Sequence, residues 1–143
     1  MTGTSFKVMC CTICFILLTS MFQATYSQTE PQTDQNLNVR YVSIINLIAN
    51  PFRFHDSVVR VIGHVRLSAK GVAVYLTKSD AEYELTKNGL WLYVDETMQS
   101  RVDGLDMQVC GVVGKFDANN TGPQGLWNGS FTKVIAIGPL NKD

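Results

Sequence analysis

The sequence has no excess of charge of either sign. Its 143 residues contain 12 Lys and Arg against 12 Asp and Glu, and 45% of the residues are hydrophobic. Proteins that bind mainly through phosphate contacts usually show a clear excess of Lys and Arg, so nucleic acid is a less expected partner. The apolar content is too high for a disordered chain, and the length suggests a single domain.

Signatures of catalysis and metal binding are also missing. The only histidines are His55 and His64, and beyond residue 27 the chain has no HxH, HExxH or paired-cysteine spacing and no GxSxG motif. We therefore expect no metal, no cofactor and no enzyme. The alternative is a minor hydrolase or metal-dependent activity around His55, Asp56 and His64.

The N-terminus reads as an export signal. Residues 8–22 are apolar and uncharged, follow the single base Lys7 and lead into a polar segment. The stretch is shorter than the roughly 20 residues of a membrane span. We predict a signal peptide over residues 1–27, cut after Ser27, with a cut after Ala24 or an uncleaved anchor as alternatives. The mature protein would be periplasmic or secreted, with no stable membrane span.

Cysteine is scarce beyond this signal. Three of the four cysteines lie within residues 1–27, so the mature chain keeps only Cys110 and has no internal disulfide. Cys110 stands in an apolar run, which predicts a buried and unreactive thiol. The domain must then be stabilised by its core alone.

The mature chain divides into a polar, flexible lead-in over residues 28–38 and a folded domain over residues 39–143. Apolar spacing predicts a helix over residues 39–50, with Ser43 as N-cap and Asn50 and Pro51 at its end. Helical turns are possible within residues 80–85 and 96–101. Period-two alternation predicts five strands, over residues 58–67, 72–77, 90–94, 107–116 and 131–137.

The first and fourth predicted strands share a pattern. Each reads apolar-x-Val-x-Gly-x-Val, with Gly63 and Gly111 at its centre. A glycine normally weakens a strand, so the pattern predicts a bend or bulge that lets one strand serve two sides of a small barrel, unless the match arises by chance.

The segments VVRVIGHVRL, AVYL, NGLWLYV, QVCGVVGKFD and GLWNGSFTKV together resemble the oligonucleotide/oligosaccharide-binding (OB) fold over roughly residues 39–140. This resemblance implies a mainly β, five-stranded, partly open barrel with one N-terminal helix, which would plug the open end. The run from residue 42 to 67 also looks like a group of small exported bacterial proteins of unassigned function.

Ligands of such barrels lie across strands two and three, beside the loops that join strands one and two and strands four and five. Alternation there predicts aliphatic residues inside and Tyr75, Trp91 and Tyr93 on the outer face. The long loop over residues 117–129 adds Trp127. These rings would form a platform for a ligand or partner, unless the N-terminal helix covers them.

Three basic residues, Arg60, His64 and Arg66, share the outer face of the first strand and complete the candidate site. They form a weak patch in a nearly neutral chain. Given the expected export, an oligosaccharide, a peptide or an envelope protein suits the site better than nucleic acid. The first hypothesis is an exported, non-catalytic binding module. The second is a structural or assembly protein of the cell envelope that docks on a larger partner.

Overall fold

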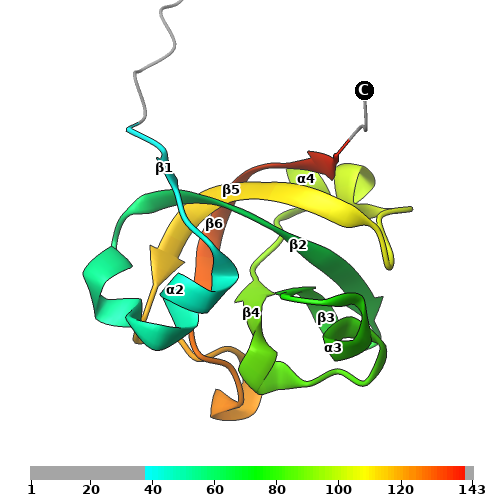
Figure 1. Ribbon diagram of the computed structural model, residues 1–143. Coiled ribbons are helices and arrows are strands. Elements are labelled where there is room, and N and C mark those ends of the chain that lie inside the picture. The colour runs from blue at the N-terminus through cyan, green and yellow to red at the C-terminus, as the bar shows by residue number, and fades with distance from the viewer. Residues whose placement is uncertain (1–37, 141–143) are drawn as a thin grey trace, which may run out of the picture. The chain divides into compact units, whose positions relative to one another are not determined.

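The computed structural model describes residues 38–140, which form a mainly β fold (Figure 1). The predicted signal peptide and nearly all of the predicted lead-in lie outside these residues. The strands are β1 (Arg40–Tyr41), β2 (Val58–Ser68), β3 (Gly71–Tyr75), β4 (Gly89–Leu92), β5 (Val109–Asp117) and β6 (Ser130–Pro139). Three short helices join them: α2 (Ile44–Ala49), α3 (Lys78–Glu82) and α4 (Glu96–Val102). The sequence predicted five strands and one helix, and it placed helical turns within residues 80–85 and 96–101, which α3 and α4 overlap.

The six strands form one mixed sheet in the order β1-β2-β3-β4-β6-β5, and a further pairing of β2 with β5 closes five of them into a ring. The ring is not a regular barrel. Its β4–β6 contact is parallel and only two residue pairs long, whereas the other ring pairings are antiparallel. Figure 1 shows the long strands β2 and β5 curving side by side across the ring.

Strand β2 serves two sides of this ring. Its first part, from Val58 to His64, pairs with β5, and its last part, from His64 to Ser68, pairs with β3. Gly63 lies where the pairing changes. A Cβ atom there would stand 2.5 Å from the carbonyl oxygen of Tyr75, so the backbones approach more closely than a side chain allows.

The helix α2 occupies only the second half of the predicted segment 39–50 and begins at Ile44, directly after the predicted N-cap Ser43. Arg40 and Tyr41 pair in parallel with β2 instead, and the amide of Val42 donates to the carbonyl of Arg60 (3.0 Å). Helix formation then starts after Ser43, whose hydroxyl accepts from the amide of Asn46 (3.3 Å), as an N-cap should. Sheet pairing therefore overrides the helical pattern before residue 43.

The interior of the ring holds the main core. On β2, Val59, Val61 and Val65 are buried, as their alternation predicts. The helices α2 and α4 add buried side chains to this core, among them Leu47 and Val102. Cys110 also lies there, fully buried and free, and burial raises the pKa of its thiol. The thiol is thus held in its neutral, unreactive form.

Helix α3 begins with a capping box built around a buried carboxylate. The Thr77 hydroxyl accepts from the amide of Asp80, and the Asp80 side chain accepts from the amide and hydroxyl of Thr77 (3.1 and 2.6 Å). Asn88, next to β4, donates a further hydrogen bond to Asp80 (2.8 Å). The carboxylate therefore joins the two ends of the segment between β3 and β4.

We expect Asp80→Ala to lower the free energy of unfolding by about 1–2 kcal/mol at pH 7, because it removes the carboxylate half of the capping box and leaves the donors of Thr77 and Asn88 unpaired. The hydrogen bonds from Thr77 and Asn88 lower the pKa of Asp80. Their contribution is therefore full above the unfolded pKa and is lost as the pH falls through the lower folded pKa. Urea unfolding at pH 7 and pH 3 checks this: an equal loss at both values would contradict it.

Candidate functional site

A second buried cluster lies on the opposite face of β3 and β4 from the main core. Alternation assigns six aliphatic residues to the core: Val72, Val74, Leu76, Leu90, Leu92 and Val94. Five of them lie in it or pack against it, whereas Leu76 is 36% exposed, so its prediction is wrong. The alternate residues of these strands, Ala73, Tyr75 and Trp91, point the other way and form the second cluster with Ala81 of α3 and Trp127 of the β5–β6 loop, and Met107 packs against it. The predicted side of Tyr75 and Trp91 is therefore correct.

The sequence left two alternatives for these rings, an exposed platform or a covered cluster, and three of the four rings follow the second. Tyr75, Trp91 and Trp127 are only 2%, 7% and 6% exposed, whereas Tyr93 is 42% exposed. The N-terminal helix does not cover them, since α2 packs in the main core. The cover comes from α3, through Ala81, and from the loop between β5 and β6.

That loop folds back because of two local features. Gly122 has a φ of 65°, and a Cβ atom there would lie 2.5 Å from Cδ1 of Trp127, so the turn needs glycine. The amide of Trp127 also donates to the carbonyl of Thr121 (3.0 Å). The indole of Trp127 then sits between Trp91 and Tyr75, with ring centroids 5.4 and 5.5 Å apart. These tilted contacts are favourable for aromatic pairs.

The aromatic cluster forms one wall of a pocket of about 290 Å³, which we call the aromatic pocket. Its apolar lining comes from β3, β4 and the β5–β6 loop: Ala73, Tyr75, Trp91, Pro123, Leu126 and Trp127. Its polar lining comes from the end of β2, the β2–β3 turn and the segments flanking β4 and β6: Arg66, Ser68, Lys70, Glu84, Thr86 and Gln124. An apolar cavity with a few convergent polar groups is the usual form of a small-molecule site.

The charges of the aromatic pocket are nearly balanced. Nη1 of Arg66 lies 2.8 Å from Oδ2 of Asp106, and Nζ of Lys70 lies 3.3 Å from Oε2 of Glu84. Nε of Arg66 is buried and has no acceptor among the described residues. Burial raises the pKa of Tyr75 to about 12, so its hydroxyl is neutral and can donate.

Four of the seven predicted site residues line this pocket, namely Tyr75, Trp91, Trp127 and Arg66. Tyr93 lies just outside, with its ring 6.5 Å from that of Trp91 and its hydroxyl donating to Asn120 (3.2 Å).

The other two predicted residues do not line the aromatic pocket. The Arg60 guanidinium lies over the ring of Tyr41, 5.3 Å from its centroid, and lines two other hollows. His64 pairs with Tyr75 and Val109 across the sheet, and its Nδ1 is buried without a partner in the described part of the chain. The three bases therefore do not act as one patch.

Sequence reasoning missed Lys70, Glu84, Gln124 and Leu126. Lys70 could have been found, because it lies in the turn between the first and second predicted strands, where such folds bind ligands. Glu84 had no such signal. It has a φ of 47°, and only its ion pair with Lys70 brings it to the pocket.

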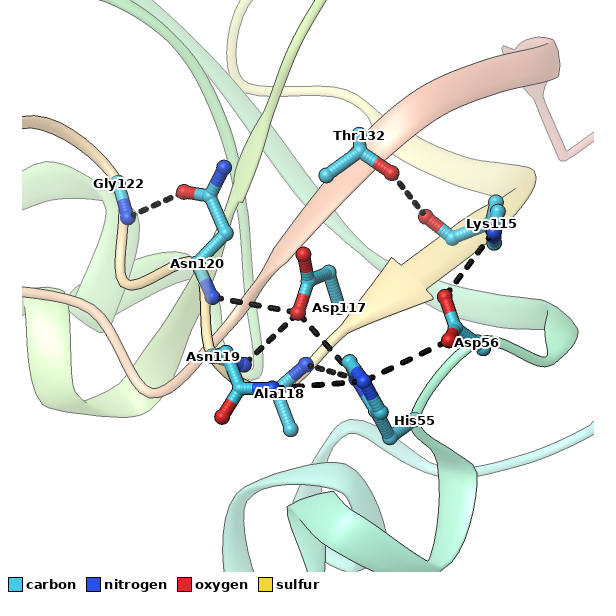
Figure 2. A network of polar contacts seen from close by, with 9 residues as sticks. All are labelled: His55, Asp56, Lys115, Asp117, Ala118, Asn119, Asn120, Gly122 and Thr132. Atoms are coloured by element: carbon cyan, nitrogen blue, oxygen red, sulfur yellow. Dashed lines mark hydrogen bonds and ion pairs between the residues drawn. The ribbon is translucent and has the colours of Figure 1, made fainter.

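Polar side chains gather around His55, at the other end of the β5–β6 loop (Figure 2). Its Nδ1 lies 3.2 Å from Oδ1 of Asp117 and accepts from the amide of Ala118 (3.3 Å), while its Nε2 lies 3.5 Å from Asp56. Lys115 pairs with Asp56 (3.0 Å), and these contacts lower the pKa of Asp56.

The network contains His55 and Asp56 of the catalytic alternative but not His64. Within residues 38–140 no group of three or more His, Cys, Asp or Glu side chains is placed to hold a metal ion. Oδ1 of Asp117 accepts instead from the amides of Asn119 and Asn120 (2.8 and 3.3 Å), and Asn120 accepts from the amide of Gly122 (3.1 Å). The network thus fixes the start of the loop that covers the aromatic cluster.

Comparison of the chain with family models, with curated proteins and with solved structures finds no match. The resemblance to a group of small exported proteins therefore stays a prediction. In the part of the chain that the structure describes, no helix is both long enough and apolar enough to cross a membrane.

Proposed function

We propose that this chain is a non-catalytic binding module that takes a small ligand in the aromatic pocket. One observation carries the proposal: four residues chosen from sequence as binding residues, on β2, β3, β4 and the β5–β6 loop, converge on the same cavity. The cavity combines an aromatic wall with a guanidinium that has an unused donor. Such a combination orients a ligand through few polar contacts and binds it through apolar area.

The arrangement of strands supports an OB-like interpretation of the fold. The ring runs β2-β3-β4-β6-β5, so its first strand neighbours both the second and the fourth, and α4 lies between the third and fourth. The aromatic pocket lies over the second and third strands of that ring. It is bordered by the turn between the first two and by the loop between the last two, where OB domains bind their ligands.

Export, as predicted from residues 1–27, narrows the ligand to compounds available outside the cytoplasm, such as oligosaccharides and peptides. The intact mass of the protein recovered from the producing cells tests the export step, since cleavage after Ser27 removes a defined mass. If the recovered protein keeps its first residues, cleavage after Ser27 does not occur, and only the lining of the aromatic pocket restricts the class of ligand.

Intrinsic fluorescence tests the proposed function directly. The protein has two tryptophans, Trp91 and Trp127, and both line the aromatic pocket. We expect at least one class among neutral oligosaccharides, tripeptides and short oligonucleotides to change the emission in a saturable way.

Two substitutions locate any binding that is found. Leu126→Lys, at a half-exposed position of the pocket lining, should abolish the response, while Leu140→Lys, at a similar exposure outside the pocket, should leave it intact. No response from any class would overturn the proposal.

A second candidate function, docking on a larger envelope protein, is favoured by one other surface. Tyr41 and Ile62 are 75% and 51% exposed and flank Arg60 over a shallow hollow. Apolar side chains gathered around an arginine are typical of interface centres. Crosslinking in cells tests this candidate, and recovery of the monomer alone would contradict it.

A further inference from the structure

We propose that the ligand of the aromatic pocket is a six-membered ring that carries a single carboxylate, with the carboxylate bound to Arg66. This inference rests on the proposed function and names the chemistry of its ligand. It follows from the donors of the pocket, from their charge balance and from the size of the cavity.

The guanidinium of Arg66, in the lining of the aromatic pocket, is held by Asp106 on one side and has an unpaired Nε on the other. Asp106 takes Nη1 (2.8 Å) and also accepts from the amide of Leu67 (2.8 Å), so the side chain is fixed in position. Nε has no acceptor among residues 38–140 although it is buried. The N–H of Nε points in the same direction as one N–H of Nη2, and these two parallel donors match the two oxygens of a carboxylate.

The neighbouring groups also favour an acceptor. Trp91, Trp127 and Tyr75 line the aromatic pocket, and none of them brings a negative charge: an indole N–H can only donate, and the pKa of Tyr75 is raised to about 12 by burial, so its hydroxyl stays neutral. The one carboxylate of the lining, Glu84, is already paired with Lys70. A ligand that brings an acceptor oxygen therefore meets no uncompensated negative charge in the lining, and Arg66 still has a donor without a partner.

The charge balance limits the ligand to one negative group. Lys70 and Arg66 each have a carboxylate within 3.3 Å, so the pocket offers no continuous positive track for a chain of phosphates. Only the unused edge of Arg66 remains for an anion. A single carboxylate satisfies it, whereas a polyanion would meet Glu84 and Asp106.

The cavity and its wall define the rest of the ligand. A volume of about 290 Å³ is at the small end of ligand pockets, which run from about 300 to 1,000 Å³, so it suits a ring and not a long chain. Trp91, Trp127 and Leu126 give that ring an apolar surface to pack on. Both an aromatic acid and a sugar acid have this chemistry.

Two matched pairs of probes test the inference on the full chain: benzoate against benzamide, and glucuronate against glucose. Each pair has the same ring and differs in the charged group. We expect at least one acid to bind at least tenfold more tightly than its neutral partner, since a charge-assisted hydrogen bond contributes about 1.5–3 kcal/mol. The acid that binds identifies the source as aromatic or saccharide.

Variants assign this preference to Arg66. Arg66→Gln should reduce the affinity for the acid at least tenfold, and Arg66→Lys, which keeps the charge near Asp106 but lacks the paired donors, should also reduce it. Arg60→Gln is the control, because Arg60 is on the same strand but outside the aromatic pocket. Thermal unfolding of each variant confirms that the fold is retained.

The outcomes separate the two proposals. Binding without preference for the acid in both pairs, or an unchanged preference in both Arg66 variants, would overturn the inference and leave the proposed function standing. The same holds if none of the four probes binds while a compound of the wider panel does. If neither the probes nor the panel change the tryptophan emission, both proposals fail.

Discussion

Replacing Gly63 with alanine is expected to destabilise the protein by about 3 kcal/mol or more. The new Cβ would lie 2.5 Å from the carbonyl oxygen of Tyr75, 2.6 Å from Cδ1 of Ile44 and 2.8 Å from Cγ2 of Val74. The first of these atoms belongs to the backbone of β3 and cannot rotate away, so the strands must separate. Urea unfolding followed by circular dichroism measures the loss.

Gly111 provides a matched control. It lies on β5, in the same sequence pattern as Gly63, but a Cβ there would lie 3.3 Å from the flexible end of Arg60. Gly111→Ala should therefore change the free energy of unfolding by less than about 1 kcal/mol, because the guanidinium can move aside. Similar losses in the two variants would show that the close approach of β2 and β3 is not the cause.

This pair of glycines shows what a pattern can and cannot predict. The repeated motif correctly indicated a strand that serves two sides of the ring, but it attributed the same role to both glycines. Only β2 changes partner at its glycine, from β5 to β3, whereas the irregularities of β5 lie next to Gly114 and Lys115. Whether a glycine marks a change of pairing partner depends on which distant strands pair at that point, and a local sequence motif does not carry that information.

The same limit applies to the aromatic residues. Alternation along β3 and β4 predicted which rings face away from the core, because side chains of a strand alternate between its two faces. It could not predict that Trp127 and Gly122 fold over those rings, since that depends on where a 12-residue connection returns. The rings are therefore walls of a cavity and not an open platform.

Of the candidate site, the residues on strands were the more predictable part. Arg66, Tyr75 and Trp91 follow from alternation together with the usual binding face of such rings. Glu84 and Gln124 lie in irregular segments with positive φ values, where a sequence gives no periodic signal. The ion pair of Glu84 with Lys70, which limits the charge of the ligand, therefore follows only from the folded structure.

Replacing Trp127 with alanine is expected to cost about 3–5 kcal/mol, the usual loss for a buried large aromatic residue. Its indole packs against both Trp91 and Tyr75, so its removal uncovers the cluster. Tyr75 then regains contact with water, and its pKa should fall from about 12 toward the ordinary value near 10. Urea unfolding measures the first effect, and ultraviolet absorbance of tyrosinate during an alkaline titration measures the second.

The two readouts distinguish loss of packing from loss of cover. Leu126→Ala, one residue earlier in the same loop and half-exposed, should leave both the stability and the tyrosinate titration nearly unchanged. Trp127→Phe should restore part of the stability, because a smaller ring still contacts Tyr75. A loss of less than about 1 kcal/mol for Trp127→Ala, together with an unshifted tyrosinate titration, would show that the β5–β6 loop does not cover the aromatic cluster. The aromatic pocket would then be an open surface, and the buried donors on which carboxylate binding depends would be absent.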